Sequence, residues 1–396
     1  MHGSLLAEEM RKLLEAFHVG IKEDYKISLD QYIDFCKKIG DLNLAKEWRD
    51  ELEGMIEGFL SRGVVVSYDF LCAWNLYLSV ATFFEKKHVD RCSAFIATGD
   101  ATKDGQIVMA HNTHCAFLWG QFYNIIQYTK PSKGQGRAFI MQTAPGLLCS
   151  NVDWFLCESG IVGCETTIAR TTYFPDFSGK NTPYFCRIRE CMQYANSLDD
   201  CERIMSTGNA GDYACGWLFG DVNSGEIMLL EVAKTVASRR TKSGVFYGSN
   251  FAHDATIRRT QTTNDKEFEN PKSSIRCRGE RIDWLLNELH WGELDAKIAK
   301  TIISDHYDQH RHATRRGNRS ICKHGELNSE RSGKRPAHYP FGAIDGKVVT
   351  SDMAKKMAFF GRWGSSCGRS YRPNKTWKRK IPYLPIFRKE PWTKLQ

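Results

Sequence analysis

The stretch Cys92-Ser93-Ala94-Phe95-Ile96-Ala97-Thr98-Gly99 is followed by Lys103-Asp104-Gly105 and then by Gln106-Ile107-Val108-Met109-Ala110-His111-Asn112. Two apolar runs thus flank an Asp-Gly dipeptide, which is a strong short-range signal for a β-hairpin. A cysteine opens the first predicted strand, and a His-Asn pair ends the second. The sequence therefore predicts a hairpin with polar, reactive side chains at one end.

The chemistry of a free N-terminal cysteine fits this layout. A thiol is intrinsically nucleophilic but mostly protonated at neutral pH. A free α-amine titrates near ~7.7–8.0, where a general base works well. Cys92 would supply both groups once the bond between Arg91 and Cys92 is cut. The alternative is a buried strand cysteine without a catalytic role, since free thiols are among the most buried groups.

Composition narrows the class of protein. The 396 residues are 42% hydrophobic, which allows a substantial core. No uncharged apolar run is long enough for a membrane span, and the charged, helix-like stretch at 1–17 is not a signal peptide, so we expect a cytoplasmic protein. None of the 14 cysteines forms a C-x-x-C pair, so we expect reduced thiols and no structural zinc site of the usual spacing. A disulfide framework stays open as the alternative.

The net charge of +9 comes almost entirely from the C-terminal tail. Residues 369–396 hold nine basic residues and one acid, which leaves 55 − 9 = 46 basic and 46 − 1 = 45 acidic residues in the rest of the chain. Such a tail would contact an anionic membrane surface, with nucleic acid the less favoured partner, or fold over its own body. Several of its large apolar side chains favour partial packing: Trp377, Tyr383, Leu384, Ile386, Phe387 and Trp392.

The chain divides into three predicted parts. Residues 1–91 are expected to form a helical pro-segment, with an amphipathic helix over 42–60 that Gly63 ends and a second helix over 69–84. Residues 92–368 mix strands and helices in blocks, which indicates an α+β layered fold. The predicted strands include 138–142, 147–150, 154–157 and 161–168, and the predicted helices include 183–197 and 276–289. Residues 369–396 form the basic, aromatic tail.

Several short motifs occur in a specific order between about Glu53 and Cys367. They are Glu53 to Gly58, the Cys92 hairpin, His111-Asn112-Thr113, Glu158 to Val162 with Glu165-Thr166-Thr167, Trp217 to Asp221, Gly248-Ser249-Asn250, Gly342 to Lys347 and Arg362-Trp363-Gly364. In these motifs the chain resembles the N-terminal-nucleophile (Ntn) hydrolases related to acyl-coenzyme A:6-aminopenicillanate acyltransferase, and in particular their phospholipase B-like relatives. The resemblance implies a four-layer αββα sandwich made as a precursor that cleaves itself before the cysteine.

The resemblance also implies an active site and a reaction. Cys92 matches the nucleophile, His111 a histidine that contacts or orients it, and Asn250 the asparagine of the oxyanion hole. An arginine of the late helix completes the site; Arg278 is our choice, although Arg276 and Arg281 are close in sequence. The implied reaction is hydrolysis or acyl transfer from an amide or ester through an acyl-thioester, without a cofactor. The implied partner is a small acylated or lipid substrate, with the pro-segment still bound.

The chain departs from the family at two places near the expected substrate pocket. His114 and Cys115 follow Thr113 where relatives often have tryptophan, and Ala214-Cys215-Gly216 replaces a stretch that commonly contains asparagine. Thr113, His114 and Cys215 are therefore candidates for lining the pocket. We hypothesise that the imidazole of His114 lowers the pKa of the Cys92 thiol.

Two other function classes remain open. His306 and His310 have i, i+4 spacing beside His312, Asp305 and Asp308, which is a weak signal for a metal-dependent enzyme. A degenerate hydrolase scaffold that binds a partner without catalysis is also possible, because a fold does not guarantee activity. Within the leading class, a phospholipase B-like lipid esterase is the alternative to an amidase.

Overall fold

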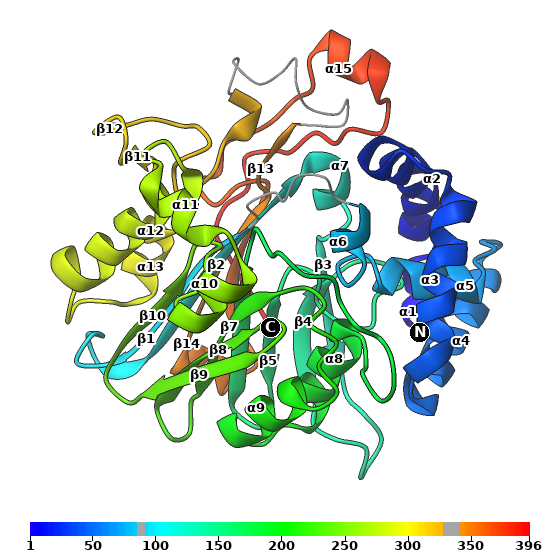
Figure 1. The fold of residues 1–396 in the computed structure, drawn as a ribbon, viewed down its shortest axis with the longest axis horizontal. Coiled ribbons are helices and arrows are strands. Elements are labelled where there is room, and N and C mark those ends of the chain that lie inside the picture. Colours follow the sequence, from blue (N-terminus) through cyan, green and yellow to red (C-terminus); the bar gives the residue numbers. More distant parts are fainter. Residues whose placement is uncertain (85–91, 328–339) are drawn as a thin grey trace.

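The computed structural model describes residues 1–84, 92–327 and 340–396 (Figure 1). Within these ranges the chain after Cys92 is built around two antiparallel sheets of seven strands each. The first sheet has the order β10 (Gly244–Gly248), β1 (Cys92–Gly99), β2 (Gly105–Ala116), β14 (Asp345–Thr350), β15 (Phe359–Trp363) and β16 (Thr393–Leu395), with β13 (Phe341–Ala343) also paired to β2. The predicted Asp-Gly hairpin is confirmed as β1 and β2.

The second sheet follows the chain in simple order. Its strands are β3 (Ile125–Thr129), β4 (Phe139–Thr143), β5 (Trp154–Cys157), β6 (Ile161–Thr167), β7 (Cys215–Asp221), β8 (Glu226–Val232) and β9 (Val236–Thr241). Helices α8 (Tyr184–Tyr194) and α9 (Leu198–Ser206) cover its outer face, and α12 (Ser274–Trp284) and α13 (Ala296–Ile302) cover the outer face of the first sheet. The predicted α+β class and αββα sandwich are confirmed.

The alternation of side chains along β1 shows how the layers are packed. Ala94 and Ile96 lie in the apolar cluster between the two sheets, whereas Phe95 and Ala97 lie in the cluster under α12 and α13. Successive side chains of a strand point to opposite faces, so a strand buried on both faces carries apolar residues throughout. By the same alternation, Cys92 shares the inner face with Ala94 and Ile96.

Six helices occupy the described part of the N-terminal segment: α1 (His2–Leu5), α2 (Ala7–Tyr25), α3 (Leu29–Asn43), α4 (Lys46–Leu60), α5 (Tyr68–Asn75) and α6 (Ala81–Phe84). The predicted amphipathic helix corresponds to α4, and Gly63 follows it with a φ of +71°. The predicted single helix over 69–84 is wrong, because it is divided into α5 and α6. At the division, Asn75 donates to the carbonyls of Leu71 and Gly146 and accepts from the N–H of Leu148.

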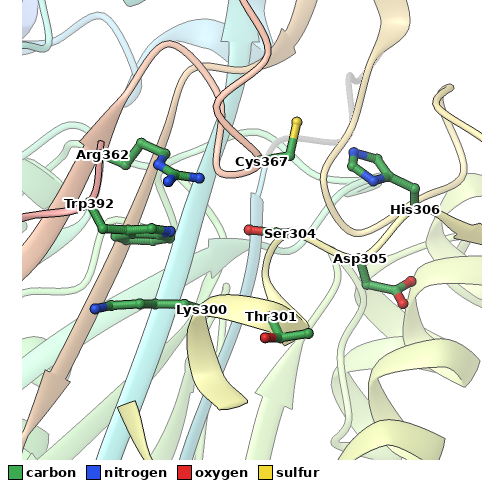
Figure 2. A pocket seen from close by; sticks show the side chains of 8 residues that line it. All are labelled: Lys300, Thr301, Ser304, Asp305, His306, Arg362, Cys367 and Trp392. Carbon is green, nitrogen blue, oxygen red and sulfur yellow. The ribbon is translucent and has the colours of Figure 1, made fainter. Parts of the chain in front are cut away.

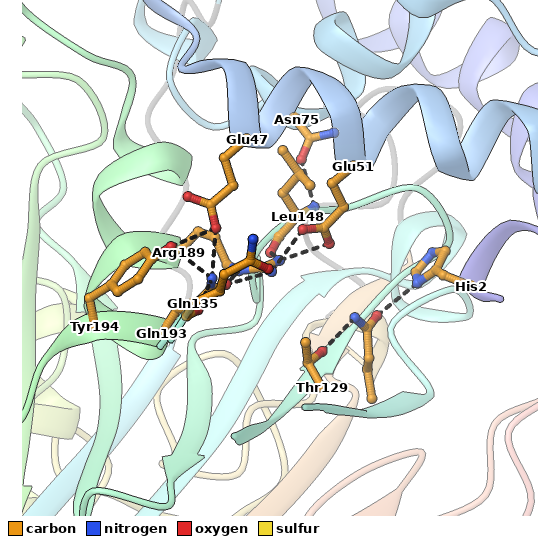
Figure 3. Close-up of polar contacts among 11 residues, drawn as sticks. His2, Glu47, Glu51, Asn75, Thr129, Gln135, Leu148, Arg189, Gln193 and Tyr194 are labelled. Carbon is orange, nitrogen blue, oxygen red and sulfur yellow. Dashed lines mark hydrogen bonds and ion pairs between the residues drawn. The ribbon is translucent and has the colours of Figure 1, made fainter. Parts of the chain in front are cut away.

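A polar network attaches this helical segment to the sheets (Figure 3). The Arg189 guanidinium of α8 binds both carboxylate oxygens of Glu51 on α4 at 3.0 and 2.8 Å. It also lies over the rings of Trp48 and Phe139, at 5.0 and 4.9 Å from their centroids. Arg189 is only 3% exposed and Glu51 28% exposed, so this ion pair is largely shielded from water. The apolar core beneath it is continuous between the two parts.

One other local prediction is wrong, and two elements were not predicted. Residues 147–150 form no strand; the N–H of Leu148 is bonded to Asn75 and its carbonyl to Arg189, and these bonds replace a strand partner. The strand β9 and the helix α11 (Asn264–Glu269) were not expected. Their sequences are polar, and the contacts that order them come from neighbouring elements.

The C-terminal tail packs on the body, as its aromatic content predicted. Its last strand, β16, extends the first sheet beside β15, and Phe387 packs against Phe117. The helix α15 (Lys375–Lys380) precedes both of these segments in the sequence. Among the described residues, none of the helices combines the length and apolar character that crossing a bilayer requires.

We expect Arg189→Ala to lower the free energy of unfolding by about 3 kcal/mol, because it leaves the Glu51 carboxylate without its partner in a largely buried site. Urea unfolding of the full chain measures this, with Cys92→Ala as the background so that every sample has one intact chain. Arg203→Ala is the matched control on the next helix. Its pair with Asp200 is exposed, so we expect a loss of less than about 1 kcal/mol. Equal losses would show that the Arg189 network does not hold the segment.

Candidate active site around Cys92

Cys92 begins β1 directly opposite Thr113 of β2 and is 2% exposed. Because Cys92 shares a face of β1 with Ala94 and Ile96, its side chain lies between the two sheets. The expected cleavage position cannot be described further, because Arg91 lies outside the described residues.

Arg278 connects the start of β1 with the end of β10. Its Nη1 donates to the Cys92 carbonyl oxygen at 2.6 Å and to Ser93 Oγ at 2.9 Å. Its Nη2 donates to the Ser249 carbonyl at 3.1 Å and to Asn250 Oδ1 at 2.7 Å. The side chain is completely buried on α12. One planar guanidinium thus fixes the backbone of the expected nucleophile relative to the expected oxyanion donor.

The two neighbouring arginines lie elsewhere. Arg276 pairs with Glu280 on the same helix, and Arg281 pairs with Asp305. Of the three arginines that the sequence left open, the structure thus brings Arg278 to Cys92.

Asn250 has an unusual backbone conformation, with a φ of +78°, and is fully buried. Positive φ costs energy for residues other than glycine and persists where the surroundings enforce it. Arg278 holds the amide oxygen, and Nδ2 donates to the Thr167 carbonyl at 2.9 Å. These two bonds fix which end of the amide carries the N–H donors, as an oxyanion hole requires.

Two carboxylates lie beside Cys92. Cys92 Sγ and one oxygen each from Asp153 and Glu165 all lie within 4.8 Å of one another. Tyr213 donates to Glu165 at 2.7 Å, and Tyr184 donates to Asp153 at 3.0 Å. All of these residues are buried, so the acidic pair belongs to the interior of the site.

This environment keeps the Cys92 thiol protonated. Burial, followed by the charges of Glu165 and Asp153, raises the pKa of Cys92 well above its usual value. The backbone N–H of His114 and the Lys347 ammonium oppose this rise with smaller effects. The hypothesis that the His114 imidazole lowers this pKa is wrong: the ring nitrogen Nε2 lies 3.0 Å from the Ile321 carbonyl, and the contribution of His114 comes from its backbone.

His111 lies on β2 opposite Ala94, on the same strand face as Thr113. Burial, and then the Lys347 ammonium on the adjacent strand β14, hold the pKa of His111 well below its usual range, so the ring is neutral. A backbone contact with Glu165 opposes this shift. Among the described residues no hydrogen bond joins the His111 ring to Cys92, so the expected contact is not made in that way.

A cavity of about 20 Å³ lies against Cys92, which is room for roughly one water molecule. Thr113 and His114 are among its lining residues, as the sequence suggested. The predicted third member, Cys215, is not; it lies on β7 opposite Thr167. Part of the lining comes from the N-terminal segment, through Tyr77 and Leu78.

Sequence reasoning missed the charged residues around Cys92. Lys347 donates to Thr113 Oγ1 at 2.9 Å and to Asp345 at 3.1 Å, and Asp345 also accepts from the N–H of Thr113. Glu165, Asp345 and Lys347 stood inside motifs used for the family resemblance, but no role was given to them. A charged residue within an otherwise apolar strand is a usable signal, because burying it requires a specific partner.

The histidines proposed for a metal-dependent enzyme do not share a helix. The segment from Tyr307 to Thr314 forms the short strands β11 (Tyr307–Asp308) and β12 (Ala313–Thr314). Asp308 instead binds Arg319. The described residues contain two groups of side chains that could hold a metal ion: the Cys92 group, and a separate one with His306.

Comparison with known proteins gives distant similarities. No protein-family model matches the chain. An uncharacterized protein of Archaeoglobus fulgidus is 25% identical over 239 residues, which cover 55% of this chain and 38% of that protein, so the chain spans less than half of the relative's length.

Among solved structures, the Caenorhabditis elegans ortholog of N-acylethanolamine-hydrolyzing acid amidase is 11% identical, with a TM-score of 0.38 over 66% of this chain and 93% of that one. A mutant of conjugated bile acid hydrolase from Clostridium perfringens is 9% identical, with a TM-score of 0.41 over 72% of this chain and 97% of that one. Because these TM-scores are below 0.5, the function is inferred below from the chain's own geometry.

Proposed function

We propose that this protein is a self-processing cysteine hydrolase that cleaves an acyl amide, with transfer of the acyl group to an amine as a second possible outcome. The observation that carries the proposal is the Arg278 guanidinium, which binds both the Cys92 carbonyl and the Asn250 side-chain oxygen. Such a bridge holds a nucleophile and an oxyanion donor in a fixed relation, which supports acyl-transfer chemistry.

The first step converts the uncut chain into the active form. Cys92 Sγ attacks the carbonyl carbon of Arg91, the C–N bond to Cys92 breaks, and the nitrogen takes up a proton to become a free amine. Water then hydrolyses the resulting thioester, giving a carboxylate at Arg91 and the thiol at Cys92. No free amine exists before this step, so another base must take the thiol proton. Glu165 and Asp153 are near enough to do so.

The second step is turnover of substrate. The freed α-amine takes the thiol proton, and Sγ attacks the acyl carbon of the substrate. An Asn250 amide N–H stabilises the oxyanion, and the leaving amine departs with a proton. Water, or an acceptor amine, then breaks the acyl-thioester and restores the thiol. None of these steps needs a cofactor.

The pocket supports an apolar acyl group as the part of the substrate that is recognised. Its lining includes Leu78, Trp119, Tyr123 and Val152 beside Cys92. The cavity is small because Tyr77 and Leu78 of the pro-segment help to close it. We therefore propose that cutting the chain lets this stretch move, while the Arg189–Glu51 network keeps the rest of the pro-segment bound.

A degenerate scaffold is the second candidate, and the buried, protonated thiol in a very small cavity is the observation that favours it. Ester hydrolysis, as in a phospholipase B-like enzyme, differs only in the leaving group. Processing and turnover therefore have to be measured separately.

Glu165→Gln should slow self-cleavage by about 10²–10⁴-fold if Glu165 is the base of the first step. The time course of the intact mass after synthesis measures this rate. Glu158→Gln is the control, since Glu158 is an exposed carboxylate at the start of the β5–β6 turn. If Glu165 acted only through its charge, its removal would lower the pKa of Cys92 and speed cleavage, which is the opposite result.

For turnover, we expect the processed protein to release free acid from N-acyl amides, with an acyl adduct on Cys92 seen by mass spectrometry. Cys92→Ala should abolish release, and Asn250→Ala should lower kcat by about 10²–10³-fold through loss of an oxyanion donor. Asn223→Ala, at an exposed turn, is the control and should match the parent. Matched acyl esters in the same assay separate amidase from esterase activity. Complete processing without turnover of either series would support the scaffold candidate.

A further inference from the structure

A second cluster of reactive side chains lies apart from the Cys92 site. It contains His306 before β11, Cys322 and His324 after β12, and Cys367 after β15. One ligand atom from each residue, two nitrogens and two sulfurs, lies within 4.8 Å of the others. Two histidines with two cysteines are one of the standard donor sets of structural zinc sites.

The spacing of the donor atoms matches that of a tetrahedral zinc ion. His324 Nε2 lies 3.4 Å from Cys322 Sγ and 3.4 Å from Cys367 Sγ. With Zn–S and Zn–N bonds of ordinary length, tetrahedral geometry places a nitrogen and a sulfur about 3.6 Å apart. The cluster is thus already close to the size that the ion needs.

The surroundings orient the histidines as metal ligands. Glu326 Oε1 lies 2.8 Å from His324 Nδ1, a contact in which Nδ1 donates, so Nε2 is the ring nitrogen that faces the two cysteines. A carboxylate behind a metal-binding histidine is a common supporting contact. The Nε2 atom of His306 is buried and has no hydrogen-bond partner among the described residues.

An entry path for the ion is also present. His306 and Cys367 lie on different segments beside a pocket of about 400 Å³, together with Arg362 and Trp392 (Figure 2). Cys322 and His324 are not among the residues that line this pocket, and both are buried. Four protein ligands complete a tetrahedral shell, which is typical of a structural rather than a catalytic zinc site.

We propose that His306, Cys322, His324 and Cys367 form a structural zinc site. Its position connects it to the wall of the active site. Asn112 Nδ2 donates to the carbonyls of Ile303 and Ile321 and to Ser366 Oγ, at 2.8, 3.1 and 3.2 Å.

These three partners of Asn112 each lie within one to three residues of a proposed zinc ligand. Asn112 itself precedes Thr113, the residue opposite Cys92. By joining the segments around 306, 322 and 367, the ion would hold this end of β2 in place. The proposal does not depend on which reaction Cys92 carries out.

The first experiment is elemental analysis of the purified full-length protein, followed by replacement of zinc with Co²⁺. We expect about one zinc per chain and a Co²⁺ absorption spectrum with thiolate-to-metal and tetrahedral ligand-field bands. In each of the single variants Cys322→Ser and Cys367→Ser, the thiolate-to-metal band of the Co²⁺ protein should be lost or fall to about half its intensity. His310→Asn and Cys277→Ser, a nearby histidine and a cysteine outside the cluster, should behave as the parent.

A milder variant covers the case in which cysteine variants do not fold. Glu326→Gln keeps all four ligands and should weaken zinc affinity by about 10–100-fold in a chelator competition. A parent protein that binds neither zinc nor Co²⁺ after reduction would overturn the proposal. So would an intact mass about 2 Da low that maps to a Cys322–Cys367 disulfide, or loss of metal in His310→Asn with retention in Cys367→Ser.

Discussion

The buried guanidinium of Arg278 is the interaction on which the candidate active site depends. A charged side chain with no exposure to water must have its donors satisfied by protein oxygens. Here those oxygens come from the first two residues of β1 and from the residues that follow β10. Lysine would not replace it, because a single ammonium cannot serve two strands in the same planar geometry. The outer helix layer thus determines where Cys92 and Asn250 lie within the sandwich.

The charges around Cys92 suit a precursor better than a finished enzyme. Two carboxylates and burial keep the thiol protonated, and residues of the pro-segment fill the space where an acyl group would bind. If the chain is cut as proposed, a new amine and a new carboxylate will appear beside these groups, and the balance of charge will change. The Arg189–Glu51 pair and the shared apolar core lie away from the cut, so they do not depend on it. On the opposite side of β2, Asn112 connects the site to the proposed zinc cluster.

The sequence was informative where one local rule decided the structure. The Asp-Gly hairpin and the amphipathic helix, predicted over 42–60 and observed as α4, follow from turn chemistry and hydrophobic periodicity. The order of short motifs led to Arg278, although sequence alone did not separate it from Arg276 and Arg281. Prediction failed where residues distant in the sequence determine the local backbone structure. The backbone of Leu148 is bonded to the side chains of Asn75 and Arg189, and no sequence pattern near residue 148 indicates this. Of the proposed zinc cluster the sequence pointed only to His306, and with the wrong partners, because the four residues span 306 to 367 without a C-x-x-C pair.

The intact mass of freshly purified protein, beside Cys92→Ala, tests the central claim most directly. If Cys92 is a self-generated N-terminal nucleophile, the 45.3 kDa parent chain separates under denaturing conditions into pieces that end at Arg91 and begin at Cys92, whereas Cys92→Ala stays whole. A single full-length mass for both proteins, in a parent that nevertheless hydrolyses acyl amides, would contradict the claim that the free amine of Cys92 is the base.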